Sequence, residues 1–151
     1  MAIEWYSANW EDGKAVSELL DEIQGDTFSL IDVPDSPRDL NLALSDKFLE
    51  AGWAQNFKIS GSNLYVSFKR DRTAACVQLG NVARVYADLL KLQNLFDRKT
   101  IDNAILIVPS DPLSKEFGAN HASFGRTVRD IETLSLSLTC PLLVMSISKG
   151  L

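Results

Sequence analysis

Two short strand-like runs followed at once by a helical pattern constrain the fold of this chain most. Residues 64–68 and 73–79 are rich in apolar and β-branched side chains, and the polar turn 69–72 separates them. Asn81 comes next, where its side-chain oxygen can accept a hydrogen bond from a free amide of a first helical turn. Apolar residues then recur at helical spacing: Val82, Val85, Tyr86, Leu89 and Leu90. The sequence therefore predicts strand, turn, strand and helix in immediate succession.

Elements in this order form the core of the PD-(D/E)XK nucleases, and residues 57–147 resemble the BglII/BamHI-like type II restriction endonucleases. That family carries an Asp before a Phe on the first strand and, nine residues later, a Glu before Val-Gln on the second. Here Val66-Ser67-Phe68 and Ala75-Cys76-Val77-Gln78 stand at these positions with the nine-residue spacing intact. The resemblance implies that Ser67 and Cys76 replace the two catalytic carboxylates. It also implies that Gln78 matches the Gln that this family has where most of the superfamily has Lys.

These two replacements argue against hydrolysis. The family cleaves phosphodiesters with Mg²⁺, a hard cation that prefers carboxylate and water oxygens. A serine hydroxyl supplies little anionic field, and a cysteine sulfur is a soft ligand. We therefore expect no metal and no other cofactor at this site, and Mg²⁺ only if the protein is active.

Other carboxylates leave an alternative open, an active type II restriction endonuclease that cleaves double-stranded DNA with a relocated metal ligand. Asp71 lies in the predicted turn, where we expect it to face solvent. The alternative needs an acid, such as Glu22 or Asp88, close to both Ser67 and Gln78. A third possibility is an unrelated α/β protein with an accidental match. The remaining candidate acids lie on or just after predicted helices: Glu18, Asp21 and Asp97.

Composition is that of an ordinary globular protein, with 151 residues, 46 % hydrophobic and 23 % charged. We expect one domain, residues 1–151, with an acidic helical part (1–50) and a nuclease-like core (51–151). No apolar run approaches a membrane span, and the N-terminal residues lack a signal-peptide pattern, so we expect a cytoplasmic protein without membrane contact. Cys76 and Cys140 lie in apolar runs and are expected to be buried core residues.

Charge is distributed unevenly along the chain. Residues 1–50 carry twelve acids and three bases, a net charge of −9, whereas residues 51–151 carry twelve bases and eight acids, a net charge of +4. The second part could therefore still favour a phosphate backbone. The acidic part is either an ordinary solvated surface or a surface that docks a basic protein partner.

The remaining pattern predicts an α/β fold: a restriction-endonuclease-like core with a central mixed β-sheet flanked by helices. Helices are expected at about 12–23, from Ser36 to Gly52, and near 124–136, the last with Val128, Ile131 and Leu134 facing inward. Residues 104–109 and 142–147 are continuous apolar runs typical of buried strands. Residues 28–33 are expected to form a short strand or an extended segment, and residues 110–126 are expected to form a polar loop.

The resemblance also implies where DNA would be met. The family contacts DNA with the loop after the second catalytic strand and with loops from the later part of the core, and its enzymes work as homodimers. By position, the residues able to contact DNA are Asn81, Arg84, Lys115, Asn120, His121, Ser123 and Arg126. We therefore expect a catalytically degenerate restriction-endonuclease-like protein, a non-cleaving DNA-binding or protein-interaction module.

Overall fold

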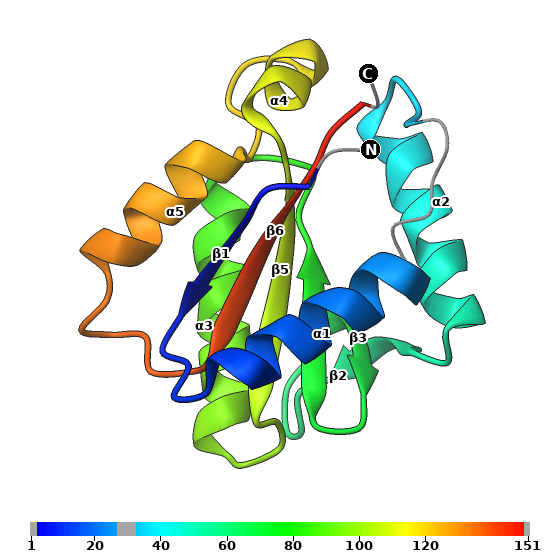
Figure 1. Ribbon diagram of the computed structural model, residues 1–151. Coiled ribbons are helices and arrows are strands. Elements are labelled where there is room, and N and C mark those ends of the chain that lie inside the picture. The colour runs from blue at the N-terminus through cyan, green and yellow to red at the C-terminus, as the bar shows by residue number, and fades with distance from the viewer. Residues whose placement is uncertain (1–2, 27–32, 150–151) are drawn as a thin grey trace.

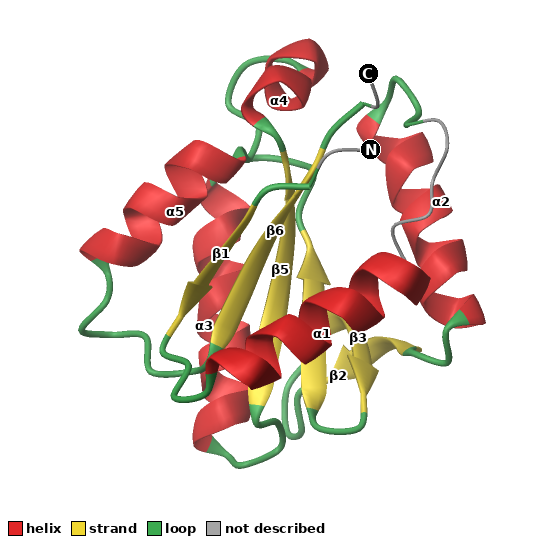
Figure 2. Cartoon of the chain, in the orientation of Figure 1, coloured by secondary structure: helices red, strands yellow, loops and turns green. Residues whose placement is uncertain are grey.

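A six-stranded mixed sheet forms the centre of the protein (Figures 1 and 2). The computed structural model describes residues 3–26 and 33–149. The strand order is β1-β6-β5-β4-β3-β2, in which β4, β5 and β6 are parallel and the other neighbours are antiparallel. The strands are β1 (Trp5–Ala8), β2 (Ala54–Lys58), β3 (Tyr65–Arg70), β4 (Thr73–Val77), β5 (Asn103–Pro109) and β6 (Leu142–Ile147).

Helices cover both faces of this sheet (Figure 1). One core lies between the sheet and α1 and α2, and a second between the sheet and α3 and α5. The short helix α4 lies beyond the end of β5. No helix in the described ranges is long and apolar enough to cross a bilayer. The helices are α1 (Gly13–Asp26), α2 (Pro37–Glu50), α3 (Ala83–Asp97), α4 (Asp111–Phe117) and α5 (Phe124–Thr133).

Local sequence explains the best-defined elements. All but the first residue of β5 and all residues of β6 are buried, as expected for apolar strands with helices on both sides. Helix α2 begins as predicted, because the Ser36 hydroxyl accepts a hydrogen bond from the Asp39 amide (3.1 Å) and Pro37 occupies the first turn. The predicted α/β architecture is confirmed.

Two strands were not predicted. β1 is only four residues long, is partly exposed and pairs with β6 at one edge of the sheet. β2 forms the other edge, and four of its five residues are exposed, including polar Gln55 and Asn56. Strands this short give almost no periodic signal: β1 has only four residues, although Tyr6 and Ala8 pack against the core, and β2 is mostly polar and exposed.

The prediction of a polar loop over residues 110–126 is wrong. Residues 111–117 form α4, capped by the Ser110 hydroxyl, which accepts a hydrogen bond from the Leu113 amide (3.3 Å). Helix α5 ends at Thr133 rather than 136, and Leu134, predicted to face inward, is 39 % exposed. Of the predicted segment at 28–33, all but Val33 lies outside the described residues.

An aromatic cluster joins α2 to the sheet. Phe48 is fully buried, stacks on Phe68 with ring centroids 4.3 Å apart, and meets Trp53 edge-on at 5.2 Å. Arg70 lies over the Trp53 ring at 4.8 Å and donates a hydrogen bond to the Ala51 carbonyl (2.8 Å), which closes the cluster toward solvent. This cluster determines where α2 lies relative to β3.

We predict that Phe48→Ala lowers the free energy of unfolding by about 3–5 kcal/mol, because it removes a fully buried ring and leaves a cavity. Urea unfolding followed by circular dichroism measures the change. Leu136→Ala is the control: Leu136 is 98 % exposed, and its truncation should change stability by less than about 0.5 kcal/mol. A loss below about 1 kcal/mol for Phe48→Ala would show that the cluster does not hold α2.

Candidate functional site

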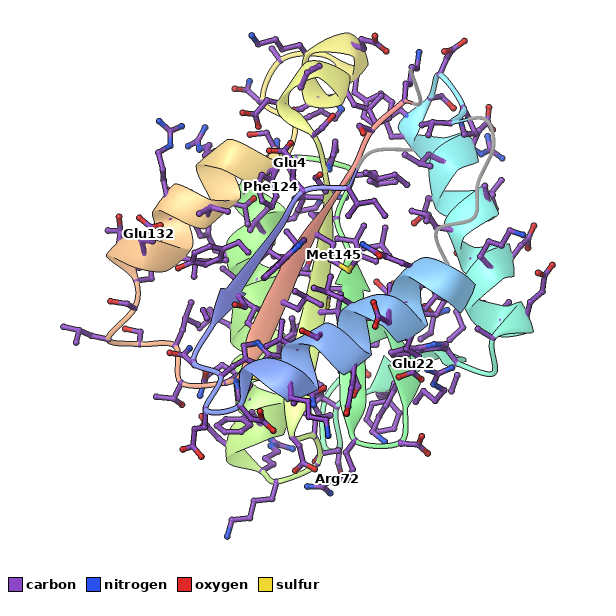
Figure 3. All side chains as sticks on the ribbon, in the orientation of Figure 1. Glu4, Glu22, Arg72, Phe124, Glu132 and Met145 are labelled. Carbon is purple, nitrogen blue, oxygen red and sulfur yellow. The ribbon has the colours of Figure 1, made fainter. Side chains whose placement is uncertain are left out.

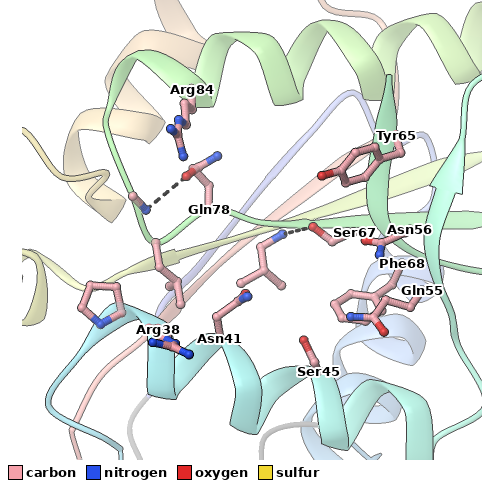
Figure 4. A pocket seen from close by; sticks show the side chains of 14 residues that line it. Arg38, Asn41, Ser45, Gln55, Asn56, Tyr65, Ser67, Phe68, Gln78 and Arg84 are labelled. Atoms are coloured by element: carbon pink, nitrogen blue, oxygen red, sulfur yellow. Dashed lines mark hydrogen bonds between the residues drawn. The ribbon is translucent and has the colours of Figure 1, made fainter. Parts of the chain in front are cut away.

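β3 and β4 diverge at Ser67. Their main-chain ladder runs from Arg70–Thr73 to Phe68–Ala75. Beyond it, β3 continues beside β2 and Val77 of β4 pairs with Ile107 of β5. The Val77 amide, which faces the gap, donates its hydrogen bond to the Ser67 hydroxyl oxygen (3.1 Å; Figure 4). Ser67 therefore stands at the fork between the two strands.

β3 twists sharply at the same residue. In a regular strand, side chains two residues apart share a face. Val66 instead packs in the core beside α3, whereas Phe68 packs in the core beside α1 and α2. The twist leaves Ser67 partly exposed at the fork.

Cys76, the second predicted position, points into the α3 core. It is 1 % exposed, and burial, together with the charge of Asp88, raises the thiol pKa. The group is therefore a neutral thiol and not a thiolate ligand. Ser67 and Cys76 lie next to each other at the fork, and Ser67 lines the two cavities there whereas Cys76 lines neither.

Gln78 follows β4 directly, and both polar atoms of its side chain form hydrogen bonds. Its Nε2 donates a hydrogen bond to Asp88 Oδ2 (2.8 Å), and its Oε1 accepts one from the Gly80 amide (3.1 Å). Asp88 is 7 % exposed, and its Oδ1 lies 3.6 Å from Lys91 Nζ. Burial raises the pKa of Asp88, while Gln78 and Lys91 partly offset this increase.

Among the candidate acids, Asp88 comes nearest to the condition for a relocated metal ligand, which is a carboxylate close to both Ser67 and Gln78. It contacts Gln78 and lines a cavity of about 410 Å³ together with Ser67. Glu22 does not, because it forms an ion pair with Arg70 at the other end of β3 (Figure 3). Asp71 lies exposed in the turn with a φ of 51°, as predicted. Asp97 accepts a hydrogen bond from Gln93 (2.9 Å).

These residues do not fit Mg²⁺. No group of three or more His, Cys, Asp or Glu that could hold a metal ion exists within residues 3–26 and 33–149. The fork offers a hydroxyl already bonded to an amide, a neutral thiol, and one carboxylate beside an ammonium group. Magnesium prefers several anionic or water oxygens in octahedral geometry.

The fork instead opens into a polar cleft between α2 and α3, about 420 Å³ in volume (Figure 4). We call it the interhelical cleft. Its lining includes the two cationic side chains Arg38 and Arg84 and no carboxylate. In the described part of the chain neither guanidinium forms an ion pair or a hydrogen bond. The residues that line it are Pro37, Arg38, Asn41, Ser45, Gln55, Asn56, Tyr65, Ser67, Phe68, Val77, Gln78, Leu79, Gly80 and Arg84.

Of the predicted DNA contacts, Arg84 lines this cleft and Asn81 lies at the loop beside it. The Asn81 side chain accepts a hydrogen bond from the Ala83 amide (2.8 Å), the first amide of α3, but the N-cap is Val82 rather than the predicted Asn81 and has no side-chain capping bond. Asn81 also forms a β-bridge with His121, and the Asn120 carbonyl accepts a hydrogen bond from the Val82 amide (2.8 Å). The two predicted contact loops therefore lie side by side.

The other predicted contacts lie outside the cleft lining. Lys115 is exposed on α4. Ser123 is the residue before α5, without a side-chain capping bond. Arg126 is on α5, 3.8 Å from Asp130.

Sequence analysis missed Arg38, Asn41, Gln55, Asn56 and Tyr65 as cleft residues. A signal existed for α2, because Arg38, Asn41 and Ser45 have the i, i+3, i+7 spacing of one helix face. The acids Asp39, Asp46 and Glu50 lie about a third of a turn around the same helix and outside the lining. The sequence of β2 gave no alternating pattern from which its cleft residues could be predicted. Asn56 adopts a positive φ of 54°, and the adjacent residues Gln55 and Asn56 both line the cleft instead of alternating between the two faces of the sheet.

Comparison with known proteins decides the family. The family model for restriction endonuclease BglII/BglIII matches residues 7–147. The chain belongs to the BglII/BglIII restriction endonuclease family. No curated protein matches it in sequence.

Two solved structures of BglII share the fold. "Crystal structure of restriction endonuclease BGLII complexed with DNA 16-mer" matches with a TM-score of 0.81 and 14 % identity, covering 99 % of this chain and 78 % of that chain. "Crystal structure of free BglII" matches with a TM-score of 0.73 and 17 % identity, covering 99 % and 81 %. BglII family membership and fold are thus shown while sequence identity is low.

We predict that Asp88→Asn makes the free energy of unfolding less dependent on pH. Because burial raises the folded-state pKa of Asp88 above its unfolded value, the contribution of Asp88 to wild-type stability falls as pH rises from about 4 through the folded-state pKa. Asparagine stays neutral, and its carbonyl oxygen can still accept the Gln78 hydrogen bond. Urea unfolding at about pH 4 and about pH 7 should show the variant gaining stability relative to wild type at the higher pH.

Asp46→Asn, at an exposed position on α2, is the matched control. It removes the same charge without relieving burial. A shift of equal size in both variants would contradict a specific burial effect at Asp88.

Proposed function

We propose that this BglII-family protein binds DNA through the interhelical cleft and does not cleave it. The observation that carries the proposal is the charge of the cleft, whose lining holds two arginines and no carboxylate, while the single carboxylate at the fork, Asp88, lines the adjoining cavity. One solved relative is described as complexed with a DNA 16-mer, which supports DNA as the ligand class.

Cleft electrostatics favour a phosphate. Arg38 approaches from α2 and Arg84 from the first turn of α3, so the two guanidinium groups come from opposite walls (Figure 4). Guanidinium groups bind phosphate oxygens with paired, charge-assisted hydrogen bonds. The acids of α2 lie outside the lining, so the acidic first part of the chain does not oppose a phosphate inside the cleft.

The same groups are poorly suited to hydrolysis. Cleavage requires a metal ion that lowers the pKa of the attacking water and stabilises charge on phosphorus. Ser67 and Cys76 supply no anionic oxygen, and the nearby Asp88 is occupied by Gln78 and Lys91. Binding without cleavage is the consequence.

Asp88 supports a second candidate function, metal-dependent cleavage of double-stranded DNA. Its contact with Gln78 and its place in one cavity with Ser67 are the observations in favour. Against it stand the single carboxylate, its raised pKa and the adjacent Lys91.

Two partner expectations accompany the proposal. A homodimer would present two clefts to one DNA molecule, as suits a symmetric site. If no DNA binds, the acidic first part of the chain becomes the better candidate for a functional surface, one that docks a basic protein.

We predict that Arg38→Ala/Arg84→Ala weakens DNA binding at least tenfold near 0.1 M salt. Each lost phosphate contact should also make the duplex salt dependence shallower by about 0.9 in the slope of log K against log salt. Band shifts with a duplex and with one of its strands measure this.

The matched control is Lys115→Ala/Arg126→Ala, which removes two cations outside the cleft. Equal weakening by both double variants would place binding elsewhere. Absence of any shift at low salt would overturn the DNA proposal.

We also predict no cleavage of plasmid DNA by wild type in Mg²⁺ or Mn²⁺, whereas Ser67→Asp/Cys76→Glu gains Mn²⁺ binding detectable by titration calorimetry. The double variant would add two carboxylates beside Asp88 and Gln78, the oxygen-rich environment that such cations require. Ser67→Asn/Cys76→Gln is the isosteric neutral control and should bind no metal. Metal-dependent nicking by wild type that Asp88→Asn abolishes would establish the second candidate function.

A further inference from the structure

The interhelical cleft offers more than phosphate ligands. Tyr65 on its rim is 54 % exposed, so its ring keeps an accessible surface even with Lys91 Nζ over one face, 5.8 Å from the ring centroid. The carboxamides of Asn41, Gln55 and Asn56 also line the cleft (Figure 4). Within the described ranges none of the three forms a hydrogen bond.

These groups match the chemistry of an unpaired nucleotide. An aromatic ring stacks on the face of any base, and a carboxamide can donate to and accept from a base edge. The arginines suit the phosphate. A cavity of about 420 Å³ lies in the range of sites that enclose one small ligand.

Asn56 and Ser67 explain why so many polar side chains meet here. The registered pairs of β2 and β3 are Gln55–Phe68 and Phe57–Val66, so Asn56 and Ser67 lie between them. Asn56 has a positive φ, and β3 twists at Ser67. Because the pleat is interrupted in both strands, adjacent side chains of β2 reach the same cleft.

We propose that the interhelical cleft binds single-stranded DNA, with one base stacked on Tyr65 and the flanking phosphates held by Arg38 and Arg84. This proposal rests on the proposed function and names the form of DNA that the cleft selects. Asn41, Gln55 and Asn56 hydrogen-bond the edge of the bound base.

A duplex cannot use the Tyr65 ring. In double-stranded DNA, neighbouring base pairs cover the base faces, and base pairing occupies one edge of each base, so Tyr65 would gain no stacking partner. Only two cations line the cleft, and the exposed acids of α2 lie on an adjacent face of the helix that forms one wall. A long phosphate track would meet those carboxylates, whereas a short single strand would not.

The test compares a fluorescent single strand of mixed sequence with the duplex of the same sequence, by anisotropy at low salt and across a salt series. Wild type should bind the single strand more tightly. The slope of log K against log salt should be about −1.4, the value for two phosphates on a single strand. Binding of the duplex with equal or higher affinity would overturn the preference.

Tyr65 provides the decisive variants. Tyr65→Leu should weaken single-strand binding on the order of tenfold, and Tyr65→Phe, which keeps the ring, should retain it. Circular dichroism melting confirms that both variants are folded. Duplex binding that depends on Arg38 and Arg84 but not on Tyr65 would overturn this inference and leave the proposed function intact. Failure of both DNA forms to bind would overturn both.

Discussion

The fork between β3 and β4 is the constraint on which the rest of the site depends. Strands that diverge leave backbone amides without ladder partners, and an unpaired amide in such a place costs about 1–3 kcal/mol. Here the Ser67 hydroxyl takes the place of the missing carbonyl by accepting from Val77. β4 can then leave β3 while it stays paired with β5 along its whole length, which brings Gln78 and the start of α3 to the mouth of the cleft. A neutral residue at position 67 thus has a structural role that requires no metal.

The charge at the fork follows from its neutral side chains. With hydroxyl and thiol groups at Ser67 and Cys76, the cleft is lined by Arg38 and Arg84 without a carboxylate, and Asp88 lies in an adjoining cavity that Arg84 also lines. The remaining acid, Asp88, is turned toward Gln78 and Lys91. A protein with a net charge of −5 therefore has a positively charged cleft at the point where its family is expected to hold a divalent cation.

Sequence patterns predicted the parts of this fold that depend on burial. β5, β6, α2 and α3 carry continuous or periodic apolar residues, and the capping role of Ser36 was predicted correctly. The edge strands β1 and β2 were not predicted, because β1 is only four residues long and β2 is mostly polar and exposed. Helix α4 was missed although Ser110, Asp111 and Pro112 form a start signal like that of α2, since the helix is only seven residues long.

The site residues also divide into those that the sequence could locate and those that it could not. Positions local to the hairpin, such as Ser67 and Gln78, were located by resemblance to the family's hairpin motifs and their spacing. Arg38 and Gln55 could not be located in this way, because α2 and β2 reach the cleft through the aromatic packing of Phe48 and the local backbone twist at Asn56. No pattern of residues along the sequence shows that α2 and β2 come together at the cleft.

The pairing of β1 with β6 affects how the chain acquires its structure. The Glu4 amide donates to the Ser146 hydroxyl, and the Ser146 amide donates to the Glu4 carbonyl, between residues 142 positions apart. Such distant partners raise the contact order and slow folding. On the ribosome, β1 emerges long before β6, so this edge of the sheet can be completed only after the last strand has been synthesised.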